Sequence, residues 1–491
     1  MTEASDPRFL PFSQGPPADI STSNSDYEIV QPTGGVAGAR VEFNVSASSA
    51  GMIDLSRSYI RSRLKIDTDA GGNPVVAYAG AAVSLEEGFS DAMWSDMDTF
   101  INGVSVGDSA PGLYPHSAFY RNALTRDAGW AEGKVIRYAA VDNNSALNGQ
   151  PQVAHMHVYY EGFRAGWGAE HCGYAFSDSQ LAIGDPAAGG MFSPDAHATL
   201  EYTGRGFTQL KIAGANSRPE FITLPAHGIW KQKDFLPSNV DLRVTMTKSA
   251  NTFCLHAAGG QAPQIDWANS TVELYLRRVY PTESMREVMA SAIIERPLRY
   301  NLMQSRATQV RIANGAVGLD ATSLLAGVRP DTVLCTFVRT ASLGAGAVNH
   351  SPFATINVLP DGAPGAHLTS LFVNWGGKQY PMRPYSEAGP RDSARAYADY
   401  LAVCEGGAFG ESHPMITPVD HANGHRVYAF NLRGDGRPAG EAATDLSQRG
   451  SLEVHAQFNG ALPAAATLVV IGFNGAAVEI DAARSIRKIG F

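Results

Sequence analysis

The amino-acid sequence predicts an all-β protein with short helices, built from two similar halves. The chain of 491 residues contains 50 glycines and 28 prolines, so turns are frequent and short strands are favoured over long helices. Segments 240–246, 271–279 and 451–458 alternate apolar and polar residues, as strands with one buried face do. A hairpin followed by a short helix occurs once in each half. Together these patterns indicate a diverged internal duplication.

The repeated unit occupies residues 98–124 in the first half. Asn102-Gly103 between two apolar runs predicts a tight hairpin turn, because both residues tolerate a positive φ. A helix around Tyr120 follows. In the second half a strand that contains Asn374 leads into Gly376-Gly377, and a helix around Tyr397 follows later. We therefore align Asn102 with Asn374 and the Tyr120 helix with the Tyr397 helix.

The two copies differ in length. Asn102 and Asn374 are 374 − 102 = 272 positions apart, whereas Leu242 and Leu452, in matching closing strands, are 452 − 242 = 210 apart. The first half should thus carry 272 − 210 = 62 additional residues between its helix and its closing strands. The stretch 127–198, rich in Gly, Ala, Asn and Asp, is the candidate insertion, and we expect it at an outer rim of the protein.

Composition and pattern divide the chain into an arm at 1–38, a first half at 39–280, a connector at 281–297, a second half at 298–481 and a tail at 482–491. The arm is too polar to bury much, so it is expected to order only against a neighbouring molecule or to fray. Within the first half, 54–67 predicts a strand with a basic edge. The tail is expected to be solvated.

The connector is predicted to be a packed helix. Ser284 and Glu287 have the spacing of a capping box, and Pro297 ends the helical pattern. An apolar stripe at helical spacing is formed by Met285, Val288, Met289, Ala292 and Ile293. We expect burial of this stripe to fix the angle between the halves.

Charge and cysteine content exclude several classes of protein. A net charge of −9 with a pI near 5.8 argues against a general nucleic-acid-binding role. No apolar run of 18 or more residues predicts a membrane span, and the first 31 residues lack the pattern of a signal peptide. The four cysteines are too few and too far apart for a disulfide framework, so reduced thiols of a protein made inside a cell are predicted: Cys172, Cys254, Cys335 and Cys404.

Three patterns were weighed as catalytic or metal sites. Gly103-Val104-Ser105-Val106-Gly107 matches a G-x-S-x-G nucleophile elbow, but a loop follows it where a helix is required. His155, His157 and the pair His171-Cys172 have no standard zinc spacing. The acidic pairs Glu86-Glu87 and Asp96/Asp98 are of a kind that any acid-rich chain offers. We predict no catalytic, cofactor-binding or metal-binding residue and no enzymatic activity.

Several longer motifs occur in a definite order between 41 and 484. They are Ile53-Asp54-Leu55-Ser56-Arg57-Ser58-Tyr59-Ile60, Phe100-Ile101-Asn102-Gly103 with Tyr114-Pro115, Leu224-Pro225-Ala226-His227-Gly228-Ile229-Trp230 with Asn239-Val240-Asp241-Leu242-Arg243, Phe253-Cys254-Leu255, Arg277-Arg278-Val279-Tyr280-Pro281 and Val478-Glu479-Ile480-Asp481. In this order they resemble double jelly-roll major capsid proteins of the Polinton, polinton-like-virus and virophage lineage. The resemblance implies two tandem eight-stranded jelly rolls joined by the helical connector.

The resemblance also implies a function. Such proteins self-assemble as pseudo-hexameric homotrimers that tile an icosahedral shell around a DNA genome. The implied partners are copies of the chain itself, neighbouring capsomers, a single jelly-roll penton protein and minor capsid proteins. The implied location is the virion, after synthesis and assembly inside the host cell. The alternative from another class is a two-domain β-sandwich carbohydrate-active enzyme or lectin.

Overall fold

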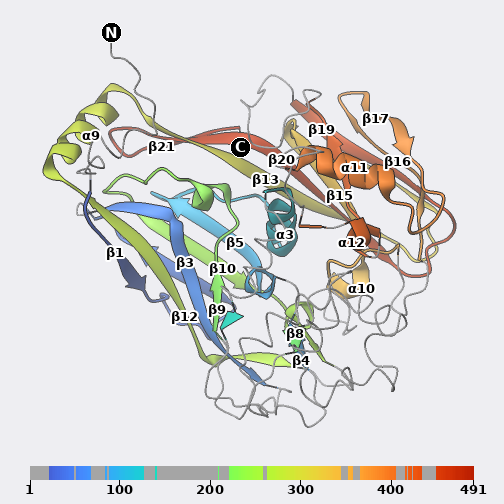
Figure 1. The fold of residues 1–491 in the computed structure, drawn as a ribbon, viewed down its shortest axis with the longest axis horizontal. Helices are drawn as coiled ribbons and strands as arrows, with labels where there is room; N and C mark the ends of the chain where they lie inside the picture. The colour runs from blue at the N-terminus through green and yellow to red at the C-terminus, as the bar shows by residue number, and fades with distance from the viewer. Residues whose placement is uncertain are drawn as a thin grey trace, which may run out of the picture.

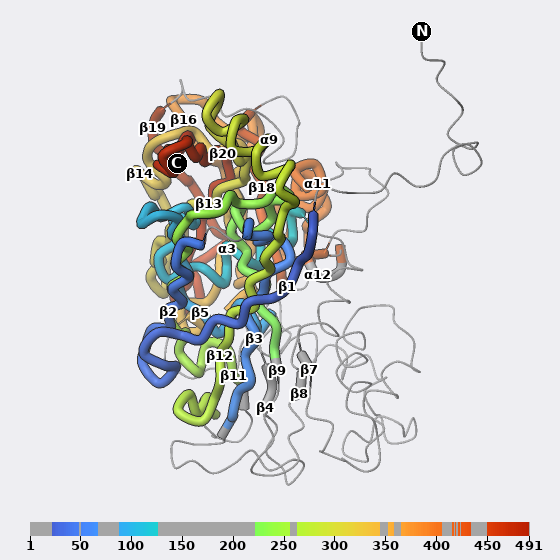
Figure 2. The backbone as a smooth tube through the Cα atoms, turned by 90° about the vertical axis from the view of Figure 1, so that its left-hand side faces the viewer, coloured from blue at the N-terminus to red at the C-terminus, as the bar shows by residue number. Residues whose placement is uncertain are grey.

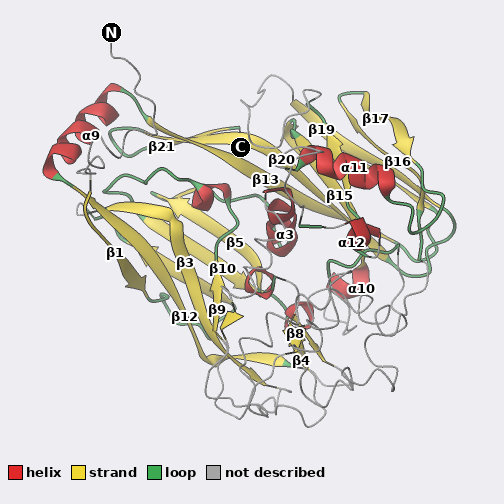
Figure 3. Cartoon of the chain, in the orientation of Figure 1, coloured by secondary structure: helices red, strands yellow, loops and turns green. Residues whose placement is uncertain are grey.

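The computed structural model describes residues 22–48, 51–67, 83–85, 88–125, 139–140, 208–209, 220–257, 263–343, 352–357, 365–404, 415–416, 418–422, 424–433 and 449–490. These residues form two strand-rich bodies side by side, with helix α3 (Tyr114–Thr125) between them (Figure 1). Helices are few and short compared with the strands (Figure 3). The predicted insertion at 127–198 lies outside the described residues except for Ala139–Ala140.

The first body is a roll of two antiparallel sheets packed face to face. One sheet has the order β1-β12-β3-β9 and continues into β7, and the other has the order β2-β10-β5-β6. Apolar side chains from both sheets meet in one buried cluster, because each strand alternates inward and outward residues. The strands are β1 Thr22–Val30, β2 Arg40–Val45, β3 Met52–Asp67, β5 Trp94–Ile101, β6 Val104–Ser105, β7 Ala139–Ala140, β9 Glu220–Thr223, β10 Leu242–Lys248 and β12 Gln264–Pro281.

A small third sheet and short helices complete the first body. The sheet has the order β11-β4-β8, with β4 Val83–Leu85, β8 Thr208–Gln209 and β11 Leu255–Ala257. The helices are α2 Phe89–Ala92, α8 Asn251–Cys254 and the 3₁₀ helix η4 Gly228–Lys231.

The second body repeats the first strand for strand. Its sheets have the orders β13-β20-β15-β18 and β14-β19-β16-β17, and each of these eight strands has a counterpart at the same place in the first body. The additional strand β21, beside β20, has none. The predicted duplication is confirmed at the level of strand order. The elements are β13 Leu298–Ile312, β14 Gly318–Val328, β15 Thr332–Arg339, α10 Thr340–Leu343, β16 Leu368–Trp375, β17 Lys378–Tyr385, α11 Ala394–Val403, α12 Pro418–Ala422, β18 Tyr428–Asn431, β19 Arg449–Phe458, β20 Ala466–Ile480 and β21 Ile486–Ile489.

The two hairpin turns align two residues away from the predicted position. Ile101 pairs with Val104 in the first body, and Trp375 pairs with Lys378 in the second. Asn102-Gly103 therefore matches Gly376-Gly377, and all four have positive φ, from 48° to 78°. The match of Asn102 with Asn374 was therefore wrong. Glycine adopts the positive φ of a tight turn as readily as asparagine, so Gly376-Gly377 forms the turn in the second half without an asparagine. With the corrected landmark, 376 − 102 = 274, and the extra chain is 274 − 210 = 64 positions.

The described part of the N-terminal segment begins with a strand of the first roll. Thr22–Val30 pairs antiparallel with β12, at the position that β13 holds beside β20 in the second roll (Figure 2). For residues 22–38 this corrects the expectation that the arm orders only against a neighbour, whereas residues 1–21 lie outside the described residues. Six of its nine residues are polar, and Tyr27 and Ile29 are exposed, so the strand is held by backbone pairing rather than by a buried face.

The last part of the chain also belongs to a sheet. Residues Ile486–Ile489 form β21, which pairs with the end of β20. The expectation of a wholly solvated tail was therefore wrong for its backbone, although Arg487 and Lys488 remain exposed. Asn102 donates a side-chain hydrogen bond of 2.7 Å to the Arg484 carbonyl, which ties the tail to the first roll.

The connector helix α9 (Glu283–Glu295) lies at one extremity of the molecule (Figure 1). Ile293 is buried at 8% exposure and Met285, Met289 and Ala292 are half-buried, but Val288 is 61% exposed. The prediction of a fully buried stripe was wrong for Val288, because only one narrow face of the helix touches the rolls. The helix begins one residue before Ser284, and its N-cap Thr282 makes no capping hydrogen bond, so the predicted capping box does not form.

Candidate functional site at the junction between the two rolls

Helix α3 forms the centre of the junction. Every residue from Tyr114 to Leu124 is buried, which is expected of a helix enclosed on all sides. Tyr114 and Ala118 belong to the core of the first roll, and the other apolar residues of the helix share one cluster with strands β15 and β20 and with helix α11 of the second roll. The members from the first roll are Ala110, Leu113, Phe119, Tyr120, Ala123 and Leu124. The two rolls therefore meet through a continuous apolar core.

A buried ion pair lies within this apolar surrounding. Arg121 is 0% exposed, and its guanidinium binds the carboxylate of Asp108. The same guanidinium donates a hydrogen bond of 2.7 Å to the Met303 carbonyl, on the first strand of the second roll. The other oxygen of Asp108 accepts the Ser305 backbone N–H at 3.1 Å. Because buried charges are tolerated only when paired and hydrogen-bonded, this pair fixes β13 against α3.

Backbone pairing adds to the ion pair at the same place. Ser109 donates its N–H to the Ser305 carbonyl at 3.1 Å and accepts the Ala307 N–H at 2.9 Å. The resulting parallel bridge joins the loop before α3 to β13. Ser117, one turn into the helix, forms a 2.5 Å hydroxyl contact with Ser305. The loop thus acts as a short additional strand beside the second roll.

An aromatic group closes one side of the junction. The rings of Phe119 and Phe353 stack with centroids 4.7 Å apart, and the His116 ring lies 5.0 Å from Phe353. His116 Nε2 lies 3.2 Å from the Pro352 carbonyl, a distance at which the neutral ring donates. Burial lowers the pKa of His116 to about 4, since a charged imidazolium would lose its hydration. The ring is therefore neutral at pH 7.

Helix α11 contributes from the second roll. The Tyr400 hydroxyl, fully buried, donates a 2.7 Å hydrogen bond to the Ala123 carbonyl at the end of α3. This bond satisfies a carbonyl that the helix leaves without an internal partner. The helices α3 and α11, which the sequence predicts to be repeats of each other, thus meet between the rolls, where the end of α3 contacts a side chain of α11.

The segment from Leu224 to Trp230 forms a second contact with β13. A Cβ on Gly228 would lie 2.4 Å from the Met303 carbonyl, so only glycine allows this approach. Trp230 donates its indole N–H to the Thr99 hydroxyl at 2.9 Å, and the same hydroxyl lies 3.4 Å from His227 Nδ1. Burial lowers the pKa of His227 as well. The segment from Leu224 to Trp230 therefore packs the first roll against β13, which accounts for its glycine and its tryptophan.

The core of the first roll extends into the second. Tyr300 and Leu302 of β13, and Ala476, Val478 and Ile480 of β20, belong to the buried cluster of the first roll. The opposite ends of the same two strands belong to the clusters of the second roll and the junction. These paired strands run across both bodies (Figure 1). Two strands of the second roll therefore complete the core of the first roll.

The candidate catalytic serine lies in a hairpin. Ser105, half-buried on β6, donates its hydroxyl to Asp98 at 2.9 Å, and no strand-to-helix elbow surrounds it. Asp98 also accepts the Thr99 N–H, and burial together with the Asp98 charge raises the pKa of Asp96.

The remaining candidates are not placed. Glu86, Glu87, His155, His157, His171 and Cys172 lie outside the described residues. Among the described residues, no group of three His, Cys, Asp or Glu side chains is arranged to hold a metal ion. Cys254, Cys335 and Cys404 are buried free thiols, as predicted. No described helix is long and apolar enough to cross a membrane.

The junction residues were not recognised from the sequence as a site. Arg121 and His116 stand in a helix that also contains Ser117 and Asn122, so its sequence does not distinguish buried polar residues from exposed ones. Asp108 offers no local signal, because its partners are 13 and 197 positions away.

Comparison with known proteins places the fold. No protein-family model and no curated protein matches the sequence. Solved structures do match. The Sputnik virophage structure matches with a TM-score of 0.54 at 9% sequence identity, over 100% of this chain and 93% of that one. The mavirus major capsid protein matches with a TM-score of 0.50 at 11% identity, over 97% of this chain and 92% of that one. PBCV-1 VP54, as fitted into a reconstruction of the virophage Sputnik, matches with TM-score 0.50 at 11% identity over 98% and 99% of the chains. The predicted double jelly-roll fold is confirmed.

Proposed function

We propose that this chain is a viral major capsid protein that acts by self-association. The observation that carries the proposal is the pair of rolls with identical strand order, held together by a buried junction. Such a chain presents two structurally similar rolls, which could each form one of the six corners of a pseudo-hexameric trimer. The double jelly-roll fold shared with virophage capsid proteins along nearly the whole chain supports the same function.

The finer proposal concerns assembly. Three copies of a two-roll chain present six similar corners, so a homotrimer is a pseudo-hexameric block that can tile a surface. We propose that these capsomers build an icosahedral shell around a DNA genome, with a penton protein and minor capsid proteins as further partners. The location is then the virion.

The described strands also refine the proposed domain boundaries. The first roll begins at β1 and ends at Pro281, the connector covers 282–297, and the second roll covers 298–481 with β21 added to its sheet. We propose these limits in place of 39–280 for the first roll.

Solution mass and imaging test the function. Sedimentation of the purified chain should give a trimer of 3 × 52.2 = 156.6 kDa, and negative-stain images of the expressed protein should show closed particles. A monomer whose melting temperature rises on addition of sugars would contradict the proposal and favour a carbohydrate-binding protein.

A further inference from the structure

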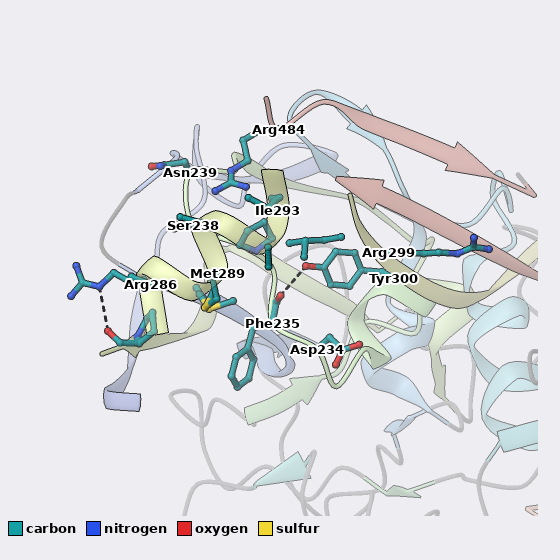
Figure 4. A pocket seen from close by; sticks show the side chains of 17 residues that line it. Asp234, Phe235, Ser238, Asn239, Arg286, Met289, Ile293, Arg299, Tyr300 and Arg484 are labelled. Atoms are coloured by element: carbon teal, nitrogen blue, oxygen red, sulfur yellow. Dashed lines mark hydrogen bonds between the residues drawn. The ribbon is translucent and has the colours of Figure 1, made fainter. Parts of the chain in front are cut away.

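A cavity of about 530 Å³ lies between α9, the segment 234–239 and the start of β13 (Figure 4). Its walls are largely apolar and include Met52, Phe235, Met289, Ile293, Leu298 and Tyr300. The Tyr300 hydroxyl donates to the Phe235 carbonyl at 2.9 Å, so the polar atom of that ring is already satisfied. A volume in the range of about 300–1,000 Å³ with predominantly apolar walls is typical of a ligand-binding pocket.

The cavity also carries unbalanced positive charge. Arg286, Arg299 and Arg484 line it, with Asp234 as the acidic residue among its described lining residues. Arg299 already pairs with Glu479 at 3.8 Å, so the remaining lining side chains sum to 2 − 1 = +1. Arg484 Nη1 is buried and has no hydrogen-bond partner within the described part of the chain. Because a buried guanidinium nitrogen without an acceptor is costly, an occupant with a carboxylate fits this wall.

Residues 1–21 precede a strand whose first residue lies beside the cavity wall. Thr22, the first residue of β1, pairs with Pro281, and Pro281 lines the cavity. Residues 1–21 contain the apolar group Phe9-Leu10-Pro11-Phe12. Their charged side chains are Glu3, Asp6, Asp19 and Arg8, which sum to 1 − 3 = −2. The segment thus matches the cavity in both apolar character and charge.

The segment is also long enough to reach it. Phe12 and Thr22 are 22 − 12 = 10 positions apart, and an extended chain of that length spans at most about 33–36 Å. A tether this short keeps its end at a millimolar effective concentration near the attachment point, which favours the same chain over a separate molecule. We propose that Phe9-Leu10-Pro11-Phe12 docks into this cavity of its own chain, with a carboxylate of residues 1–21 beside Arg484. This inference goes beyond the capsid function and does not rest on it.

Disulfide trapping in the full-length chain tests the proposal. In a Cys172→Ser background, Leu10→Cys is combined with Ala290→Cys, because Ala290 lines the cavity and is exposed enough to react. The matched control combines Leu10→Cys with Val288→Cys, two residues away on α9 but not part of the cavity wall. A mixture of ¹⁵N-labelled and unlabelled chains distinguishes links within a chain from links between chains by mass spectrometry.

The expected result is a same-chain disulfide that forms with Ala290→Cys at several times the yield found with Val288→Cys. Adding Phe9→Ser and Phe12→Ser should reduce that yield to the control level. Equal yields for the two pairs, or no disulfide, would overturn the docking. A link only between labelled and unlabelled chains would overturn the same-chain assignment and identify a neighbouring copy as the source. The measurement uses purified protein and is independent of whether particles form.

Discussion

Two of the connections between the rolls, at α3 and at α9, differ in kind. At α3 the contact is buried, mixed polar and apolar, and distributed over residues far apart in the chain. At α9 the covalent connection is mostly exposed, with Val288 and Ile294 at 61% and 75% exposure. The more extensive buried contact therefore lies at α3, whereas α9 returns the chain from β12 to β13 with only one face against the rolls.

The largest expected effect is at the ion pair of the junction. Arg121→Met leaves the Asp108 carboxylate buried without its partner, which typically costs about 3–5 kcal/mol of stability. Calorimetry should show a strongly lowered melting temperature. Arg57→Met, at a 64% exposed side chain, is the control and should change little. Equal, small shifts for both variants would mean that the junction does not carry the stability assigned to it.

Overpacking at the second contact should come next. Gly228→Ala places a methyl group against the Met303 backbone, which cannot move as a flexible side chain can, so a loss of about 1–3 kcal/mol is expected. Gly389→Ala serves as the control, because a Cβ there meets no atom within 4 Å. Urea denaturation followed by tryptophan fluorescence measures both. A Gly228→Ala protein as stable as wild type would place η4 away from β13.

Acid should loosen the junction through His116. Its pKa is about 4 in the folded chain against 6.5 for a free side chain, so the unfolded state binds more protons between these values. The contribution of the neutral ring is complete above pH 6.5 and is lost as the pH falls from 6.5 to 4. The melting temperature of His116→Phe should therefore fall less than that of wild type over this range. If the melting temperatures of the two proteins fell by the same amount between pH 6.5 and 4, the role assigned to His116 would be contradicted.

The smallest effects are expected at the connector. Ile293→Ala should cost about 1 kcal/mol, below the usual 2–5 kcal/mol for a core isoleucine, because its helix contacts the rolls on one face only. Val288→Ala should stay within about 0.5 kcal/mol of wild type, as exposed substitutions do. Melting temperatures and particle counts from the same preparations measure both variants. A loss at Ile293 as large as at Arg121 would reverse the comparison between α3 and α9.

The sequence predicted those features that depend on local pattern. Alternation identified β10, β12 and β19, and Asn102-Gly103 identified the first turn correctly, because both signals are contained in a few neighbouring residues. β1 was missed because it is polar and is held by backbone pairing. Burial of Val288 was predicted wrongly, because an apolar stripe does not show which side of a helix finds a partner.

The junction itself could not be found in this way. Arg121, Asp108 and Met303 come together only through the tertiary fold, and each alone has the character of an ordinary surface or strand residue. What the sequence did contain was the duplication, and the strand order that it implies positions α3 and α11 in the same region of the molecule.

The strands that cross both rolls have a consequence for synthesis of the chain. Val478 and Ile480, on β20, complete the core of the roll that is made first. During translation that roll must therefore wait, with part of its apolar interior uncovered, until β20 has left the ribosome. Domains of many larger proteins fold one after another as they emerge, but these two must finish together. A prematurely terminated chain would lack a closed first roll, so incomplete products would be left to chaperones and proteases rather than enter assembly.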